Sequence, residues 1–194
     1  YNSSYEMAVY NRTSSKGERW LSEFGGKLEQ SPRECVKNAD LILSCVGNDD
    51  DLRSIVYGEN GILSGMKTGA IFLDHTTASA NVAREIFKEV QKVGGEFLDG
   101  PVSGGQAGAE NGTLTVMVGG NEDAFNKIKS IVGSYAQAVT LLGDVGCGQL
   151  CKMVNQICIA GLLQSLSEGI AFGQKASSLC KNHPALQVAH CCAP

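Results

Sequence analysis

The chain has 194 residues, of which 43% are hydrophobic, so it is long enough to bury a substantial core in one domain or in one domain plus part of a second. Lysine and arginine total 16 against 20 acidic residues, and the charges are scattered, which argues against the basic stripe of a nucleic-acid-binding protein. Every apolar run is much shorter than the roughly 20 residues that a membrane span needs, so neither nucleic acid nor membrane is an expected partner.

Short apolar or β-branched runs bounded by Gly, Asn or Asp predict strands at residues 8–10, 41–46, 70–73, 96–98, 113–118 and 139–142. Helical patterns lie between these runs. One begins at Ser31, with Pro32 at the first helical position and Glu34 completing a capping box. Another covers residues 79–93, and a third carries Phe125, Ile128 and Val132 at helical spacing. The alternation predicts an α/β fold with a doubly wound, mainly parallel sheet.

From about Gly148 the pattern changes to one long helical stretch that continues through Lys175. Its residues 157–163 are apolar on nearly all sides, which predicts a buried helix that opens an all-α second domain. The predicted domains are therefore 1–145 and 146–194. Residues 177–194 lose this periodicity, and whether they fold stays open.

The chain has eight cysteines, but their spacing shows no regular pairs. Five of them stand among apolar residues, which predicts reduced thiols in the core rather than a disulfide framework: Cys35, Cys45, Cys147, Cys151 and Cys158. A zinc site would need close cysteine pairs with further ligands, and the acidic run at residues 49–51 is explained by the dipole of a following helix. No metal site is expected.

A glycine-rich turn at residues 99–105 follows the strand predicted at 96–98. The backbone N–H groups around Ser103, Gly104 and Gly105 could converge on a carboxylate without side chains in the way. An ordinary tight turn is the alternative interpretation.

Lys152 and Asn155 stand three residues apart at the start of the long helix, and so share one face of it. The helix dipole and partial burial would lower the pKa of Lys152 toward a range useful for acid–base chemistry. The alternative is a lysine that reaches water from a half-buried helix.

The first predicted strand ends in Asn11, Arg12 and Thr13, at the place where dinucleotide-binding folds distinguish the adenosine ribose. An acidic residue there would favour NAD. Arg12 can instead pair with a 2′-phosphate, so NADP is the expected cofactor, with NAD left open.

Together these segments resemble the β-hydroxyacid dehydrogenase family, which includes 3-hydroxyisobutyrate dehydrogenase, tartronate semialdehyde reductase and the glyoxylate/succinic semialdehyde reductases. The resemblance covers roughly residues 6–176 and is carried by the motifs at 97–105, 112–120 and 146–155. Gly100 stands where alanine is commoner in the family, Gln156 replaces a second asparagine, and Gly47 stands where relatives often carry proline.

The resemblance implies an NAD(P)-dependent oxidoreductase that interconverts a small 3-hydroxy acid and its semialdehyde on a Rossmann-like fold. It also implies a homo-oligomer when intact. By position it makes Lys152 the general acid and base, and Asn155 a polar support for the substrate and for this lysine. The residues expected to hold the substrate carboxylate are Ser103, Gly104 and Gly105, and those expected on the nicotinamide side are Val46, Gly47 and Thr77.

In the family, a first strand and a pyrophosphate-binding glycine-rich turn would precede Tyr1, and most of a helical domain would follow Ala176. We therefore expect a sheet that lacks its first strand, and a chain that is inactive as given. The alternative is a non-catalytic piece that at most associates through its exposed long helix. A cytoplasmic location is the default expectation, with a mitochondrial one left open.

Overall fold

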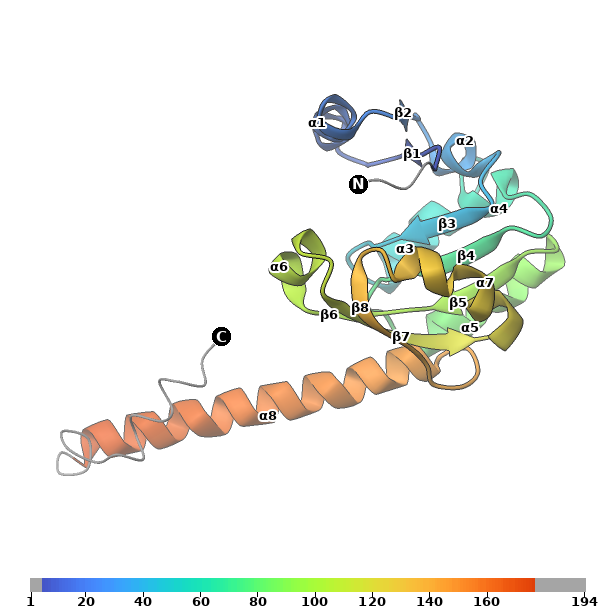
Figure 1. Ribbon diagram of the computed structural model, residues 1–194. Coiled ribbons are helices and arrows are strands. Elements are labelled where there is room, and N and C mark those ends of the chain that lie inside the picture. The colour runs from blue at the N-terminus through green and yellow to red at the C-terminus, as the bar shows by residue number, and fades with distance from the viewer. Residues whose placement is uncertain (1–4, 177–194) are drawn as a thin grey trace. The chain divides into compact units, whose positions relative to one another are not determined.

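The computed structural model describes residues 5–176 (Figure 1). It contains two compact units, Tyr1–Lys152 and Met153–Pro194. The tail at residues 177–194, for which no fold was predicted, lies outside the described residues.

Helices and strands alternate along the first unit. The elements are β1 (Ala8–Val9), α1 (Ser14–Phe24), β2 (Lys27–Leu28), α2 (Pro32–Val36), β3 (Leu41–Ser44), α3 (Asp49–Val56), α4 (Ile62–Gly65), β4 (Ile71–Asp74), α5 (Ala80–Lys92), β5 (Glu96–Asp99), β6 (Val102–Ser103), α6 (Gly105–Glu110), β7 (Leu114–Gly120), α7 (Glu122–Val132), β8 (Ala136–Leu141) and the start of α8 (Cys147–Lys175). Every strand and helix predicted from the sequence is confirmed, with shifts of a few residues at the ends. The two-residue strands β2 and β6 were not predicted.

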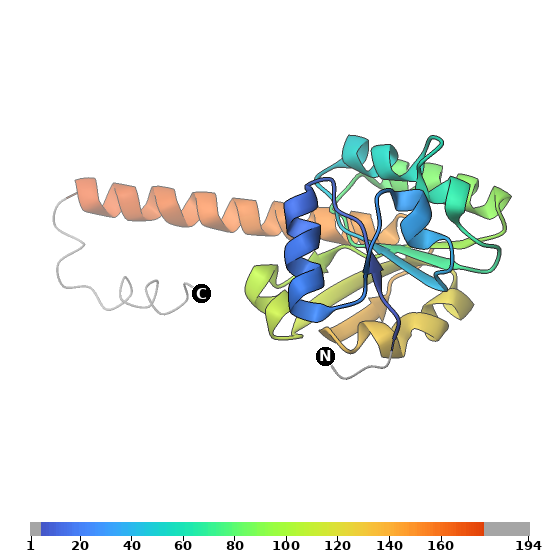
Figure 2. The same ribbon diagram turned by 90° about the horizontal axis from the view of Figure 1, so that it is seen from above.

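The main sheet has the order β3-β4-β5-β7-β6, and β8 also pairs with β7. Strands β3, β4 and β5 are parallel, as are β7 and β8, whereas β7 runs antiparallel to both β5 and β6. Strands β1 and β2 form a separate parallel pair, on which α1 packs through the contact of Gly17 with Leu28 (Figure 2). The predicted α/β class with a mainly parallel sheet is confirmed.

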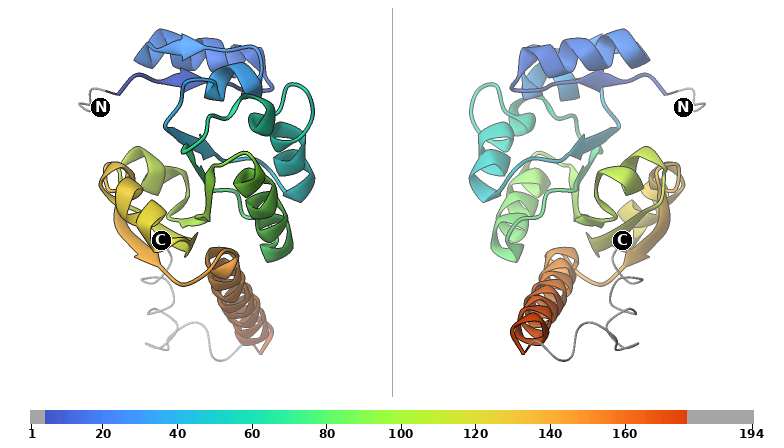
Figure 3. Two further views of the ribbon diagram at one scale, coloured as in Figure 1. Left: turned by 90° about the vertical axis from the view of Figure 1, so that its right-hand side faces the viewer. Right: turned by 90° about the vertical axis from the view of Figure 1, so that its left-hand side faces the viewer.

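Side chains of β4 and β5 alternate between the two faces of the sheet, as strand geometry requires. Phe72 and Phe97 point into a core shared with α3, α4 and α5, and their rings meet edge to face at 5.2 Å. Leu73 and Leu98 point into a second core under α7. Helices therefore cover both faces, with α5 and α7 on opposite sides (Figure 3). All four of these side chains are fully buried, which places the carboxyl ends of β4 and β5 firmly.

Side-chain caps fix where several helices begin. The Ser31 hydroxyl accepts the Glu34 N–H at 3.2 Å, so the predicted start of α2 is confirmed. Ser79 caps α5 in the same way through Val82, and Asn48 caps α3 through the N–H of Asp51 at 2.9 Å.

Two predictions about burial are wrong. The five cysteines are free thiols, but none is in the core: Cys45 and Cys158 are exposed and the other three are partly buried. On α8, Ile157 and Leu162 are 72% and 68% exposed, although their apolar surroundings predicted burial. The described part of the second unit consists of helix α8, and a single helix cannot cover its own side chains.

Within residues 5–176, no helix combines the length and the apolar character that crossing a membrane requires.

Candidate functional site

The loop after β1 carries the three residues predicted to contact the adenosine end of a dinucleotide. Asn11 accepts the N–H of Thr13 at 2.9 Å, and Thr13 is the N-cap of α1. The loop borders a pocket of about 230 Å³ lined by Tyr10, Asn11, Arg12, Ser14, Glu18, Leu28, Glu29 and Gln30. The Arg12 side chain is 80% exposed, so its guanidinium is available to a ligand in this pocket.

A buried polar cluster joins the carboxyl ends of β3 and β4. Asp74, 1% exposed, accepts hydrogen bonds from the hydroxyls of Ser44 and Thr76, both at 2.6 Å. Thr76 in turn accepts the N–H of Val46 at 3.0 Å. Burial raises the pKa of Asp74 to about 6, although these hydrogen bonds oppose the shift. The cluster holds Val46, predicted on the nicotinamide side, against the loop that follows β4.

Gln149 connects this loop to the first turn of α8. Its side chain is 1% exposed and bridges two backbone groups: Nε2 donates to the carbonyl of Thr76 at 2.7 Å, and Oε1 accepts the N–H of Ala78 at 3.0 Å. The exposed Thr77 lies between these two anchored residues. The loop predicted to face the nicotinamide is therefore fixed to the helix that carries Lys152.

Asp99, at the end of β5, fixes the same helix start to the sheet. Its buried carboxylate accepts the N–H groups of Gly146 at 2.6 Å and Gln149 at 2.9 Å. Burial raises the pKa of Asp99, and the hydrogen bonds from the backbone lower it. A Cβ at Gly148 would collide with the carbonyl oxygen of Met117 on β7, so only glycine allows α8 to start this close to the sheet.

His75 holds the residue that follows Asp99. Its Nδ1 contacts the carbonyl of Gly100, which can only accept, so Nδ1 carries the proton and Nε2 accepts from the Tyr135 hydroxyl at 2.8 Å. Burial lowers the pKa of His75 and raises that of Tyr135, so both stay neutral near pH 7. The imidazole thus anchors the start of the segment that leads to Ser103.

The predicted carboxylate-binding turn begins at Ser103, three residues after Gly100. Ser103 is partly buried on β6, where it pairs with Thr115 of β7. Gly104 and Gly105 are exposed and have φ angles of 129° and 61°, which L side chains rarely adopt. The turn therefore presents exposed backbone, as a carboxylate site needs.

Lys152 lies on α8 one turn beyond the Gln149 bridge and is partly buried. Among residues 5–176, no hydrogen bond or ion pair joins Lys152 to Ser103. Asp99 instead positions both residues. Its carboxylate caps α8, which carries Lys152, and it ends the strand that precedes Ser103. Asn155 follows on α8 in the second unit, and its Nδ2 is buried without a hydrogen-bond partner among the described residues.

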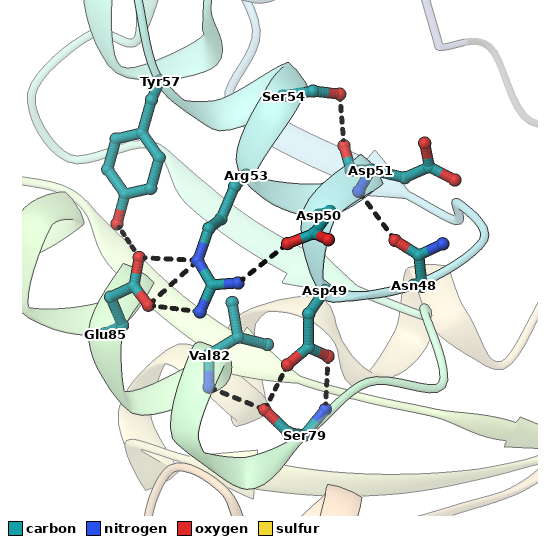
Figure 4. A network of polar contacts seen from close by, with 10 residues as sticks. All are labelled: Asn48, Asp49, Asp50, Asp51, Arg53, Ser54, Tyr57, Ser79, Val82 and Glu85. Atoms are coloured by element: carbon teal, nitrogen blue, oxygen red, sulfur yellow. Dashed lines mark hydrogen bonds and ion pairs between the residues drawn. The ribbon is translucent and has the colours of Figure 1, made fainter.

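The acidic run at residues 49–51 is distributed among separate partners. Asp49 binds the N–H and hydroxyl of Ser79, and Asp50 pairs with Arg53, as Figure 4 shows. Asp51 pairs with Arg12 at 2.9 Å. Across residues 5–176 no three His, Cys, Asp or Glu side chains gather in a way that could hold a metal ion.

Four residues that build this site were not predicted as site residues: Asp51, Asp74, His75 and Asp99. Asp74 and Asp99 end neighbouring parallel strands in register, so an acidic residue after each buried run was the available signal. Gln149 stood inside the motif at residues 146–155, but its partners lie more than 70 residues earlier in the chain and no local pattern indicates them.

Comparisons with known proteins find relatives among oxidoreductases. Residues 1–143 match the family model described as the NAD binding domain of 6-phosphogluconate dehydrogenase. An uncharacterized oxidoreductase of Shewanella frigidimarina is 53% identical, over 89% of this chain and 59% of its own length. A probable mitochondrial 3-hydroxyisobutyrate dehydrogenase-like protein of Arabidopsis thaliana is 37% identical, over 89% of this chain and 57% of its own. A 2-hydroxy-3-oxopropionate reductase of Escherichia coli is 33% identical, over 81% and 54%.

Among solved structures, 3-hydroxyisobutyrate dehydrogenase of Salmonella typhimurium matches with a TM-score of 0.78 and 26% identity, over 88% of this chain and 59% of that one. The Mycobacterium tuberculosis 3-hydroxyisobutyrate dehydrogenase, at 24% identity and a TM-score of 0.82, shares the fold over 89% of this chain and 58% of that one. The chain spans less than two thirds of the length of each of these relatives.

Proposed function

The chain belongs to the β-hydroxyacid dehydrogenase family, and from this premise we propose that it serves an oxidoreductase that interconverts a small 3-hydroxy acid and its semialdehyde with a nicotinamide cofactor. The observation that carries the proposal is the two sets of buried hydrogen bonds, of Gln149 and of Asp99, at the start of α8. Gln149 binds this helix to the loop around Thr77, and Asp99 binds it to the strand that leads into the Ser103 turn. These hydrogen bonds fix the positions of the loop around Thr77, the turn at Ser103 and the helix that carries Lys152 relative to one another.

The residues of the chain fit a dinucleotide. The exposed guanidinium of Arg12 beside an open pocket suits an anionic ribose phosphate, so Asn11, Arg12 and Thr13 would hold the adenosine end and NADP would be preferred to NAD. Val46, Gly47 and Thr77 would line the nicotinamide side, where Gly47 offers backbone alone. When bound, the cofactor supplies or accepts the hydride.

The chain's own part in the reaction is to orient the substrate and to move one proton. The N–H groups around Ser103, Gly104 and Gly105 would bind the substrate carboxylate. In reduction, the ammonium of Lys152 would donate a proton from Nζ to the carbonyl oxygen, and in oxidation the neutral amine would accept the hydroxyl proton. The unpartnered Nδ2 of Asn155 supports a role in binding the substrate oxygen.

A substrate comparison tests this proposal. We would follow NADPH consumption with malonic semialdehyde (3-oxopropanoate), whose reduction gives a 3-hydroxy acid, and with propanal, which has the same chain length but no carboxylate. The protein would be this chain extended by the corresponding segments of the Shewanella relative. We expect kcat/KM at least about tenfold higher for the semialdehyde, because the turn would otherwise leave its N–H groups without a partner.

The Ser103 hydroxyl would be a further donor to the carboxylate beside these N–H groups. Ser103→Ala in the same protein should therefore narrow the difference in kcat/KM between the two aldehydes, by raising KM for the semialdehyde alone. Equal rates with both aldehydes would contradict the proposed substrate class.

A further inference from the structure

Arg12, which the proposed function places at the adenosine ribose, already has a partner in the protein. Its Nη1 donates to Oδ1 of Asp51 at 2.9 Å, and this contact joins the loop after β1 to the first turn of α3, 39 residues later. The Arg12 side chain is 80% exposed and the Asp51 side chain 28% exposed. The carboxylate is therefore the more firmly placed member of the pair.

Local contacts fix Asp51 where it stands. Its N–H is capped by the side chain of Asn48, and its second carboxylate oxygen, Oδ2, occupies the space where a side chain at Gly47 would lie. One carboxylate thus spans the two segments proposed to contact the cofactor, with Oδ1 at Arg12 and Oδ2 at Gly47.

The neighbouring carboxylates are turned elsewhere. Asp49 is bound to Ser79, and Asp50 pairs with Arg53 at 3.3 Å, whereas the Asp51 side chain points away from this network (Figure 4). Glu18 and Glu29 also line the pocket near Arg12, but within residues 5–176 the carboxylate that pairs with Arg12 is that of Asp51.

A negative charge at this place affects two possible ligands differently. A ribose 2′-phosphate must share the guanidinium with Asp51 and is repelled by its carboxylate at close range. A ribose 2′-hydroxyl meets no such repulsion and can donate to the carboxylate. The exposure of the pair keeps the effect moderate, because water and salt screen it.

We propose that Asp51 is a specificity-determining residue that limits the preference of the site for a 2′-phosphate over a 2′-hydroxyl. The inference rests on the proposed function, since it takes Arg12 as the residue that meets the ribose. It adds that Asp51 on α3 reduces the preference for NADP that Arg12 gives, so that NAD remains a usable cofactor.

Two adenosine probes test this without the nicotinamide half of the cofactor. Calorimetry would give the Kd of the chain for adenosine 2′,5′-bisphosphate and for adenosine 5′-monophosphate, which differ by the 2′-phosphate alone. We expect Asp51→Asn to increase the preference for the bisphosphate by about threefold to tenfold at low salt, and by less at 1 M salt. Asp50→Asn removes the same charge one residue away and should leave the preference unchanged.

Arg12→Ala separates this inference from the function on which it rests. If Arg12→Ala abolishes the preference while Asp51→Asn leaves it unchanged or lowers it, the role of Asp51 is wrong and the ribose site stands. If Arg12→Ala has no effect, or if neither probe binds the unaltered chain, the proposed cofactor site is wrong and the role of Asp51 falls with it.

Discussion

Asp74 is a carboxyl group whose surroundings favour its protonated form. It lies 1% exposed at the end of β4, next to the carboxylate of Asp99 on the paired strand, and burial is the largest cause of the rise of its pKa to about 6. The hydroxyls of Ser44 and Thr76 stabilise its ionised form and limit that rise. The charge state of one residue therefore bears on the stability of the loop proposed to face the nicotinamide.

Removing this carboxyl group should change how stability depends on pH. Because the pKa in the folded protein, about 6, lies above the ordinary 3.8, the folded state binds this proton more tightly than the unfolded chain does. The resulting contribution to the free energy of unfolding is complete below about pH 4 and is lost as the pH rises through about 6. In Asp74→Asn, the free energy of unfolding relative to the unaltered chain should therefore rise by up to about 3 kcal/mol between pH 4 and pH 8.

Urea unfolding at a series of pH values measures this difference. A difference that stays flat across the range would show that Asp74 titrates alike in the folded and unfolded chain.

Sequence patterns indicated little of this residue-level chemistry. Asp74, His75 and Thr76 follow a buried run in the sequence, but the partner Ser44 is 30 residues away and Asp99 is 25 residues away. The pairing register of β3, β4 and β5 brings them together. By contrast, Lys152 and the turn at Ser103 to Gly105 were indicated by local motifs, and the structure shows how Asp99 and Gln149 position them.

At the scale of the elements, the start of α8 is the junction on which the site depends. Asp99, Gln149 and the contact of Gly148 with β7 fix it from three directions. Later in the same helix, Gly169 has no atom near the position of a Cβ. Packing thus requires glycine at position 148 of α8 and does not require it at position 169.

This contrast gives a matched pair of substitutions. Gly148→Ala should lower the free energy of unfolding by at least about 2 kcal/mol, because the new methyl group would collide with backbone that cannot move without disturbing β7. The melting temperature should fall by about 4 °C or more. Gly169→Ala should leave stability unchanged or raise it by up to about 1 kcal/mol, because alanine is the better helix former.

Thermal unfolding followed by circular dichroism compares the two variants. Equal melting temperatures for them would contradict the close packing of α8 on the sheet.

The elements themselves were predictable where local signals are strong. The cap at Ser31 located α2, and the apolar spacing of α5 and α7 located those two helices. Strands β2 and β6 are two residues long, too short for any alternation of side chains, so they exist through their pairing with β1 and β7. The predicted burial of α8 is wrong. An apolar sequence indicates that a helix can be buried, but other elements must cover it, and the exposed Ile157 and Leu162 are not covered.

At the scale of the whole molecule, the proposed site draws on the loops that follow β3, β4 and β5 of the main sheet, on the loop that follows β1 of the separate pair, and on the first turns of α8. Loops at the carboxyl ends of parallel strands meet at one edge of the sheet, which is where open α/β folds bind their ligands. The family match over residues 1–143 and the likeness to 3-hydroxyisobutyrate dehydrogenase of Salmonella typhimurium show the family and the fold. The chain spans less than two thirds of these relatives, so catalysis is a property proposed for the whole protein.

Loss of the proposed proton-transferring group is the most direct test of that account. The extended protein described above would be compared with its Lys152→Ala and Lys127→Ala variants by NADPH consumption with malonic semialdehyde, with calorimetry to check that NADPH still binds. Lys127 is an exposed lysine of α7 outside the site, and its loss should leave kcat unchanged. We expect Lys152→Ala to lower kcat by about 100-fold or more while NADPH binding is retained. An unchanged kcat in Lys152→Ala would contradict the account.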